Sequence, residues 1–192
     1  MHDWRTAWGV MLGQVVSGAG ACWQGGFSND VFPQYDIGYN ERQERFTTDG
    51  LAKVTADAMF RRVWEDCYGQ CILGQMVESD SKAALLIPEA IEAITGWENF
   101  TWEEEFVIPH RVITLERIFN MKRGLTIESD MDIGQRLMEA PLEGPAIGQS
   151  VTPHLRELIK EFYEYMGWDR ETGKPTQETL EKLDLVEAAR GL

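Results

Sequence analysis

Histidine and basic residues are scarce in this chain. Three histidines in 192 residues leave too few imidazoles for a multi-histidine metal site. Only 18 Lys and Arg face 32 Asp and Glu, which gives a formal charge of −14 and a pI near 4.6. Binding to nucleic acid or to an anionic membrane needs a basic face that meets the phosphates. The charge therefore argues against both classes of partner.

Cysteine is also rare, and long apolar runs are absent. The three cysteines, Cys22, Cys67 and Cys71, are odd in number and do not resemble the framework of a secreted domain, so they favour a reducing cytosol. Three thiolates cannot complete a four-cysteine iron–sulfur site without another ligand. No stretch approaches the roughly 20 apolar residues of a membrane span. We therefore expect a cytoplasmic protein that does not cross a membrane.

The N-terminal segment imitates a lipoprotein signal. An apolar run is followed by small residues and Cys22. Asp3 in the charged region and Gln14 inside the apolar run both count against a real signal. A lipoprotein anchored through Cys22 is therefore the last of the functions that we consider.

The rest of the composition fits one soluble domain over residues 1–192, with 43% apolar and 26% charged residues. The first 50 residues are rich in glycine and aromatic residues and show little period, and residues 18–40 are predicted to form a packed loop region. Further helices are predicted over 51–67, 81–95, 101–123, 152–166 and from 177 on, with the last one capped by Thr176. Pro109 predicts a kink or a short break. The predicted fold is all-α, an irregular multi-helix domain with a glycine-rich N-terminal loop region.

The sequence "DCYGQC" at 66–71 carries the most chemistry. Cys67 and Cys71 would lie on one face of a helix, but this spacing supplies only half of a zinc site, and two buried, unrelated cysteines explain it equally well. Gly69 favours a helix end, which would place Asp66, Gly69 and Cys71 at a plausible cofactor edge. His110 and His154 are single histidines without partners in sequence reach, so we interpret both as structural.

Several motifs resemble one family along nearly the whole chain. In order they are "HDWR" at 2–5, "GVMLGQVVSGAGACWQGGF" at 9–27, "DCYGQC" at 66–71, "RVITLERIFNMKRGLT" at 111–126 and "LIKEFYEYMGWDRETGKPTQETLEKLDL" at 158–185. They are similar to the C-terminal, mostly helical part of the tungsten-pterin aldehyde:ferredoxin oxidoreductases. "DCYGQC" matches that family's D-x-x-G-[LQ]-C, and the last two motifs are the long and specific ones.

The resemblance implies a tungsten (or molybdenum) bis-pterin beside a [4Fe–4S] cluster, aldehyde oxidation to carboxylic acids, and ferredoxin or a related subunit as electron acceptor. It implies that Asp66 holds a pterin, with Gly69 and Gln70 at its edge, and that Cys71 is the fourth cluster ligand. Cys67 is then a bystander. The other ligands would lie in upstream domains, so we expect the isolated chain to be inactive. Whether the protein forms a homo-oligomer is left open.

One residue departs from the family pattern. Trp23 follows Cys22 where classical members have a histidine that points at the metal. Indole does not act as an acid or base at ordinary pH, so the catalytic residue is unknown and the aldehyde assignment is weakened. A family member with another substrate, such as an aromatic acyl-CoA, is one alternative. A metal-free helical binding or assembly module is the other.

Overall fold

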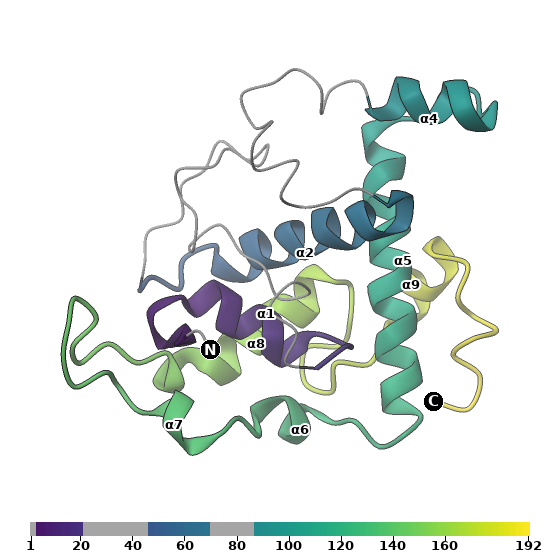
Figure 1. Ribbon diagram of the computed structural model, residues 1–192. Coiled ribbons are helices and arrows are strands. Elements are labelled where there is room, and N and C mark those ends of the chain that lie inside the picture. The colour runs from purple at the N-terminus through teal and green to yellow at the C-terminus, as the bar shows by residue number, and fades with distance from the viewer. Residues whose placement is uncertain (1–2, 21–45, 70–86) are drawn as a thin grey trace.

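The computed structural model describes residues 3–20, 46–69 and 87–192, and these residues form helices (Figure 1). The elements in chain order are η1 (Trp4–Thr6), α1 (Trp8–Val16), α2 (Leu51–Tyr68), α4 (Ile87–Thr95), α5 (Trp102–Met121), α6 (Ile127–Met131), α7 (Gln135–Met138), α8 (Thr152–Tyr165) and α9 (Gln177–Lys182). Within these ranges there is no strand, only an isolated bridge between Trp168 and Pro175. The predicted all-α class is confirmed.

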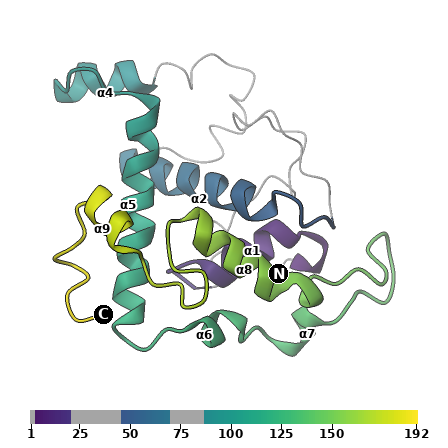
Figure 2. The same cartoon turned by 180° about the vertical axis from the view of Figure 1, so that it is seen from behind.

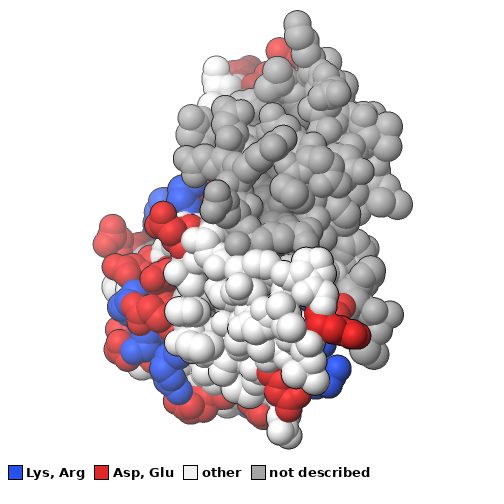
Figure 3. All heavy atoms as spheres, turned by 90° about the vertical axis from the view of Figure 1, so that its left-hand side faces the viewer, with Lys and Arg blue, Asp and Glu red and all other residues white. Residues whose placement is uncertain are grey.

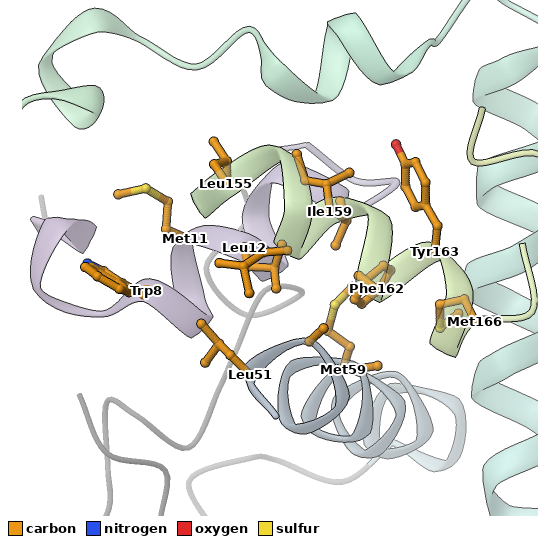
Figure 4. Packing of buried hydrophobic residues seen from close by; sticks show 14 of the residues in the cluster. Trp8, Met11, Leu12, Leu51, Met59, Leu155, Ile159, Phe162, Tyr163 and Met166 are labelled. Carbon is orange, nitrogen blue, oxygen red and sulfur yellow. The ribbon is translucent and has the colours of Figure 1, made fainter. Parts of the chain in front are cut away.

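Helix α2 is the centre of the arrangement, and it contacts α1, α5 and α8. Figures 1 and 2 show α5 standing upright across the ends of the other long helices, with α9 and the C-terminal segment beside it. The core lies where α1, α2 and α8 meet (Figure 4). Its labelled members are Trp8, Met11, Leu12, Leu51, Met59, Leu155, Ile159, Phe162, Tyr163 and Met166. In α8 these residues recur at spacings of three and four, so one face of the helix is buried and the other is polar.

Helices η1 and α1 form at the N-terminus, where the sequence predicted no helix, and most of the loop predicted over 18–40 lies outside the described residues. Helix α1 contains Gly9 and Gly13, and each lowers intrinsic helix stability by about 1 kcal/mol relative to alanine. Its residues are buried almost all round, so they show no amphipathic period. Packing against α2 and α8 therefore decides the structure of a segment that local propensity does not favour.

The start and stop residues of the later helices agree well with the sequence. Thr176 caps α9 by accepting a hydrogen bond from the Thr179 amide, and Pro153 lies in the first turn of α8. Of the kink or short break predicted at Pro109, the break does not form, because α5 is continuous from Trp102 to Met121. Pro109 is buried and α5 packs against α2, so tertiary contacts hold the helix across a residue that costs it a hydrogen bond. Helices α6 and α7 were not predicted, since each has at most five residues.

A polar contact joins the middle of α2 to the end of α8. The Tyr165 hydroxyl donates to Asp57 Oδ1 at 2.6 Å, and Lys53 Nζ donates to Asp57 Oδ2 at 2.6 Å. Burial is the main cause that raises the pKa of Tyr165, so the phenol stays a neutral donor at physiological pH. This contact fixes the crossing of two core helices.

Replacing Tyr165 with phenylalanine is therefore expected to lower the free energy of unfolding by about 1–2 kcal/mol, since a hydrogen bond to a charged acceptor is lost while the ring is kept. Urea unfolding followed by circular dichroism measures this change. The slope m should stay the same, because the variant exposes the same surface on unfolding. An unchanged midpoint would show that the contact contributes nothing.

Candidate functional site

The C-terminal end of α2 carries the first half of the "DCYGQC" motif. Asp66, Cys67 and Tyr68 form the last turn, and Gly69 ends the helix with a φ of 80°. The Gly69 amide donates to the Glu65 carbonyl at 2.9 Å. Only glycine adopts this left-handed conformation without strain, which explains why the helix stops there as predicted. Gln70 lies outside the described residues.

Asp66 is held by an arginine one turn earlier. Arg62 Nη2 donates to Asp66 Oδ1 at 2.6 Å, while the Asp66 side chain stays 63% exposed. A carboxylate near a helix C-terminus is disfavoured by the helix dipole, so this position does not serve the stability of α2. The carboxylate is thus both anchored and accessible at a helix end.

Glu65 lies beneath this pair and is buried. Its Oε2 accepts a hydrogen bond from Arg62 Nη1 at 3.1 Å, and Arg61 Nε lies 3.8 Å from Oε1. Burial raises the pKa of Glu65, and the charges of Arg62 and Arg61 partly oppose that shift. Arg62 therefore joins a buried carboxyl group to an exposed one.

Cys67 is a free, exposed thiol. The interpretation of Cys67 and Cys71 as two buried cysteines is therefore wrong for Cys67. Partial burial, followed by the charge of Asp66, raises the pKa of this thiol. A thiol with a raised pKa is a poor metal ligand, because the thiolate is the form that binds. Helix α2 itself ends at Tyr68. Cys22, Trp23 and Cys71 lie outside the described residues.

Aromatic rings surround the same end of α2. Trp64 stacks on Phe100 with ring centroids 5.7 Å apart, and Tyr68 packs against Trp64 at 5.2 Å. The indole nitrogen of Trp64 and Nε of Arg62 are buried, and neither has a hydrogen-bond partner within the described ranges. A buried donor without a partner costs about 1–3 kcal/mol, so such donors are uncommon. Sequence reasoning missed Arg62, Glu65 and Trp64, although the four-residue spacing of Arg62 and Asp66 was visible.

The sequence comparisons decide the family. The sequence profile described as "Aldehyde ferredoxin oxidoreductase, domains 2 & 3" matches residues 1–185. The chain belongs to this family. Similar relatives are the tungsten-containing aldehyde ferredoxin oxidoreductases of Pyrococcus furiosus, 37% identical over 100 residues, and of Thermococcus kodakarensis, 34% identical over 100 residues. Each alignment covers 52% of this chain and only 16% of the relative's own length.

The two described histidines of this aldehyde ferredoxin oxidoreductase family chain contact the core. His110 Nε2 lies 2.9 Å from the Met166 carbonyl oxygen, to which it donates, and its ring packs on Phe60 at 5.2 Å. Burial lowers the pKa of His110, so the ring is neutral at physiological pH. The ring of His154 packs against Trp8, with the ring centroids 5.9 Å apart. Over the described residues, no group of three or more His, Cys, Asp or Glu side chains is placed to hold a metal ion.

A pocket of about 450 Å³ lies between the C-terminal ends of α1 and α5 and the α6–α7 segment. Gln14 lines it, and the Gln14 amide nitrogen is buried without a partner in the described part of the chain. Asp130 in its wall is already bonded to Arg117. No sequence motif pointed to this pocket.

The surface is unevenly charged. On the face shown in Figure 3, charged side chains gather along one side, and the centre is largely free of them. The segment between α7 and α8 lies toward this face, and it carries Leu142 and Ile147, which are strongly exposed. Searched over the described ranges, the chain has no helix long and apolar enough to cross a bilayer.

Proposed function

We propose that this chain is the C-terminal, helical cofactor-binding part of a larger tungsten (or molybdenum) bis-pterin and [4Fe–4S] oxidoreductase. The family match over residues 1–185 and the tungsten named in the relatives support this proposal. The reaction that we assign is the oxidation of aldehydes to carboxylic acids, with ferredoxin or a related subunit as electron acceptor. Upstream domains of the same cytoplasmic enzyme are the expected partners, and the formal charge of −14 argues against nucleic acid as a partner.

The observation that carries the proposal is the anchored carboxylate of Asp66 at the capped end of α2. Pterin rings present N–H donors, and an exposed carboxylate that is held in one place is a suitable acceptor for them. Arg62 Nε and Trp64 Nε1, at the same helix end, are buried donors with no partner among the described residues, and they also fit a site that is completed by a polar group. The residues that are present therefore fit the implied group.

Within this proposal each residue of the motif has a role. Asp66 binds and orients a pterin, Gly69 and Gln70 lie at its edge, and Cys71 is the fourth ligand of the cluster. When bound, the metal–pterin group and the cluster supply the two-electron oxidation and the transfer of single electrons. The chain's own contribution is to position these groups and to tune their surroundings.

A second substrate class follows from Trp23. An indole donates a hydrogen bond but does not take up a proton at ordinary pH, so residue 23 does not replace the family histidine as an acid or base. This residue favours a family member with another substrate, such as an aromatic acyl-CoA. Comparing turnover of simple aldehydes with reduction of an aromatic acyl-CoA by the purified complete enzyme would decide between the two.

Metal analysis tests the proposal directly. We expect the complete polypeptide, expressed with tungstate and iron, to contain about one tungsten and about four irons per polypeptide. The isolated 192-residue chain is the control, and we expect it to hold no stable cluster, because one family cysteine is insufficient. A complete polypeptide that folds without tungsten, molybdenum or iron would contradict the proposal and leave the metal-free binding module.

A further inference from the structure

We propose that Arg62 is a positioning residue, which holds the carboxylate of Asp66 in the orientation that receives the pterin. This inference rests on the proposed function, and it adds a residue that the family resemblance does not assign. Arg62 and Asp66 are four residues apart on α2, so they share one face of the helix.

The burial of Arg62 distinguishes this pair from an ordinary surface pair. The Arg62 side chain is only 8% exposed, whereas the Asp66 side chain is 63% exposed. Exposed pairs at this spacing contribute about 0.3–0.5 kcal/mol and exchange freely with water. A buried guanidinium has few alternative rotamers, so its Nη2 offers Asp66 a fixed point of attachment.

Glu65 fixes the other side of the guanidinium. Arg62 Nη1 donates to Glu65 Oε2 at 3.1 Å, and the Glu65 side chain is 4% exposed. The guanidinium is planar, so holding Nη1 on Glu65 also sets the direction in which Nη2 points. A buried carboxyl group thereby orients the exposed one through a single arginine.

The pair leaves part of Asp66 available. The hydrogen bond from Arg62 goes to Oδ1, and within the described ranges no donor reaches Oδ2. Placing the arginine before the acid along the helix is also the less favourable order for helix stability, because the negative charge then lies at the negative end of the dipole. The arrangement is therefore better explained by the orientation of Oδ2 than by the stability of α2.

The test uses the complete enzyme and measures tungsten per folded polypeptide, together with the pterin released on denaturation. Removing Arg62 alone would leave buried Glu65 with Arg61 as its one ion-pair partner among the described residues. The informative variant is therefore Arg62→Gln with Glu65→Gln, which keeps the helix end neutral. We expect it to lower the tungsten content about tenfold, since supporting contacts to a ligand of a metal site are worth about 10–100-fold in affinity. Glu65→Gln alone should fall between wild type and the double variant, because Glu65 orients the guanidinium. The neighbouring control Arg61→Gln should stay within about twofold of wild type, well inside that range.

Three further variants separate positioning from folding. Arg62→Lys with Glu65→Gln keeps a cation that reaches Asp66, so it should restore most of the tungsten content. Asp66→Asn should itself lose tungsten, and adding Arg62→Gln and Glu65→Gln to it should cause no further loss, because both act through the same carboxylate. Circular dichroism at the working temperature confirms that each variant is folded.

The outcomes are distinguishable. Full tungsten content in Arg62→Gln with Glu65→Gln, while Asp66→Asn loses it, would overturn the role of Arg62 and leave the proposed function intact. The role of Arg62 would also be overturned if the combined variant lost tungsten by the product of the two separate losses, that of Asp66→Asn and that of Arg62→Gln with Glu65→Gln. Full tungsten content in Asp66→Asn would instead overturn the assignment of Asp66, on which the inference rests.

Discussion

Replacing Arg117 with methionine is expected to lower the free energy of unfolding by about 3–5 kcal/mol, because it leaves a buried carboxylate without its countercharge. Arg117 and Asp130 are both buried. Arg117 Nη1 donates to Asp130 Oδ2 at 2.7 Å, Nη2 donates to the Tyr163 hydroxyl at 2.8 Å, and Nε donates to the Gly173 carbonyl at 3.2 Å. One side chain thus joins α5, α6, α8 and the turn before α9.

The remaining donor does not compensate for the loss. The Tyr163 hydroxyl also donates to Asp130 Oδ2, and burial raises the pKa of Tyr163, so this phenol stays protonated. A neutral hydroxyl does not replace a guanidinium charge in the interior. The Gly173 carbonyl also loses its donor. Gly173 has little freedom to move, because the Arg117 and Tyr163 side chains occupy the space beside its Cα.

Urea unfolding of the 192-residue chain measures the effect. Arg156→Met is a matched control, since Arg156 pairs with Glu128 on the surface, where an ion pair contributes less than about 1 kcal/mol. Arg117→Met with Asp130→Leu should recover much of the loss, because an apolar pair removes the unpaired charge. If Arg117→Met and Arg156→Met unfold at the same urea concentration, the buried pair does not hold these helices together.

The sequence predicts the parts of this fold that depend on local chemistry. Helix α8 has an apolar face and a Thr-Pro start, and α2 has a period from Leu51 and a glycine stop at Gly69, so both were found. Helix α1 was missed because burial on nearly all sides removes the period that marks an amphipathic helix. The break expected at Pro109 did not form, because the proline rule considers the helix alone and not its packing on α2.

The contacts that matter most join residues far apart in the chain. Arg117 meets Asp130 and Tyr163, which follow it by 13 and 46 residues, and no local pattern marks such partners. At the candidate site, the helix end at Gly69 followed from glycine chemistry, but the burial of Arg62 needed the packing around α2. Spacing shows which side chains share a helix face, whereas tertiary structure shows which of them is buried and thereby fixed.

The two cysteines of "DCYGQC" give the prediction with the largest functional effect. In the complete enzyme, Cys71→Ala is expected to abolish the [4Fe–4S] cluster, because the family resemblance assigns Cys71 as its fourth ligand. Cys67→Ala is expected to leave the cluster intact. Cys67→Ala is the matched control, since it removes the same thiol group from the same motif.

The described half of the motif supports this asymmetry. Cys67 lies in the last turn of α2, before the helix end at Gly69, and its pKa is raised by partial burial and by the charge of Asp66. At neutral pH it is therefore mainly a thiol, and cluster ligation requires the thiolate.

Iron per polypeptide and the visible absorbance of the cluster measure the outcome, with circular dichroism as the check on folding. Loss of iron in Cys67→Ala together with full iron in Cys71→Ala would reverse the two roles. Full iron in both variants would remove the motif from the cluster site altogether. One comparison therefore resolves the pair, and burial, the charge of Asp66 and the end of α2 already count against Cys67 as a ligand.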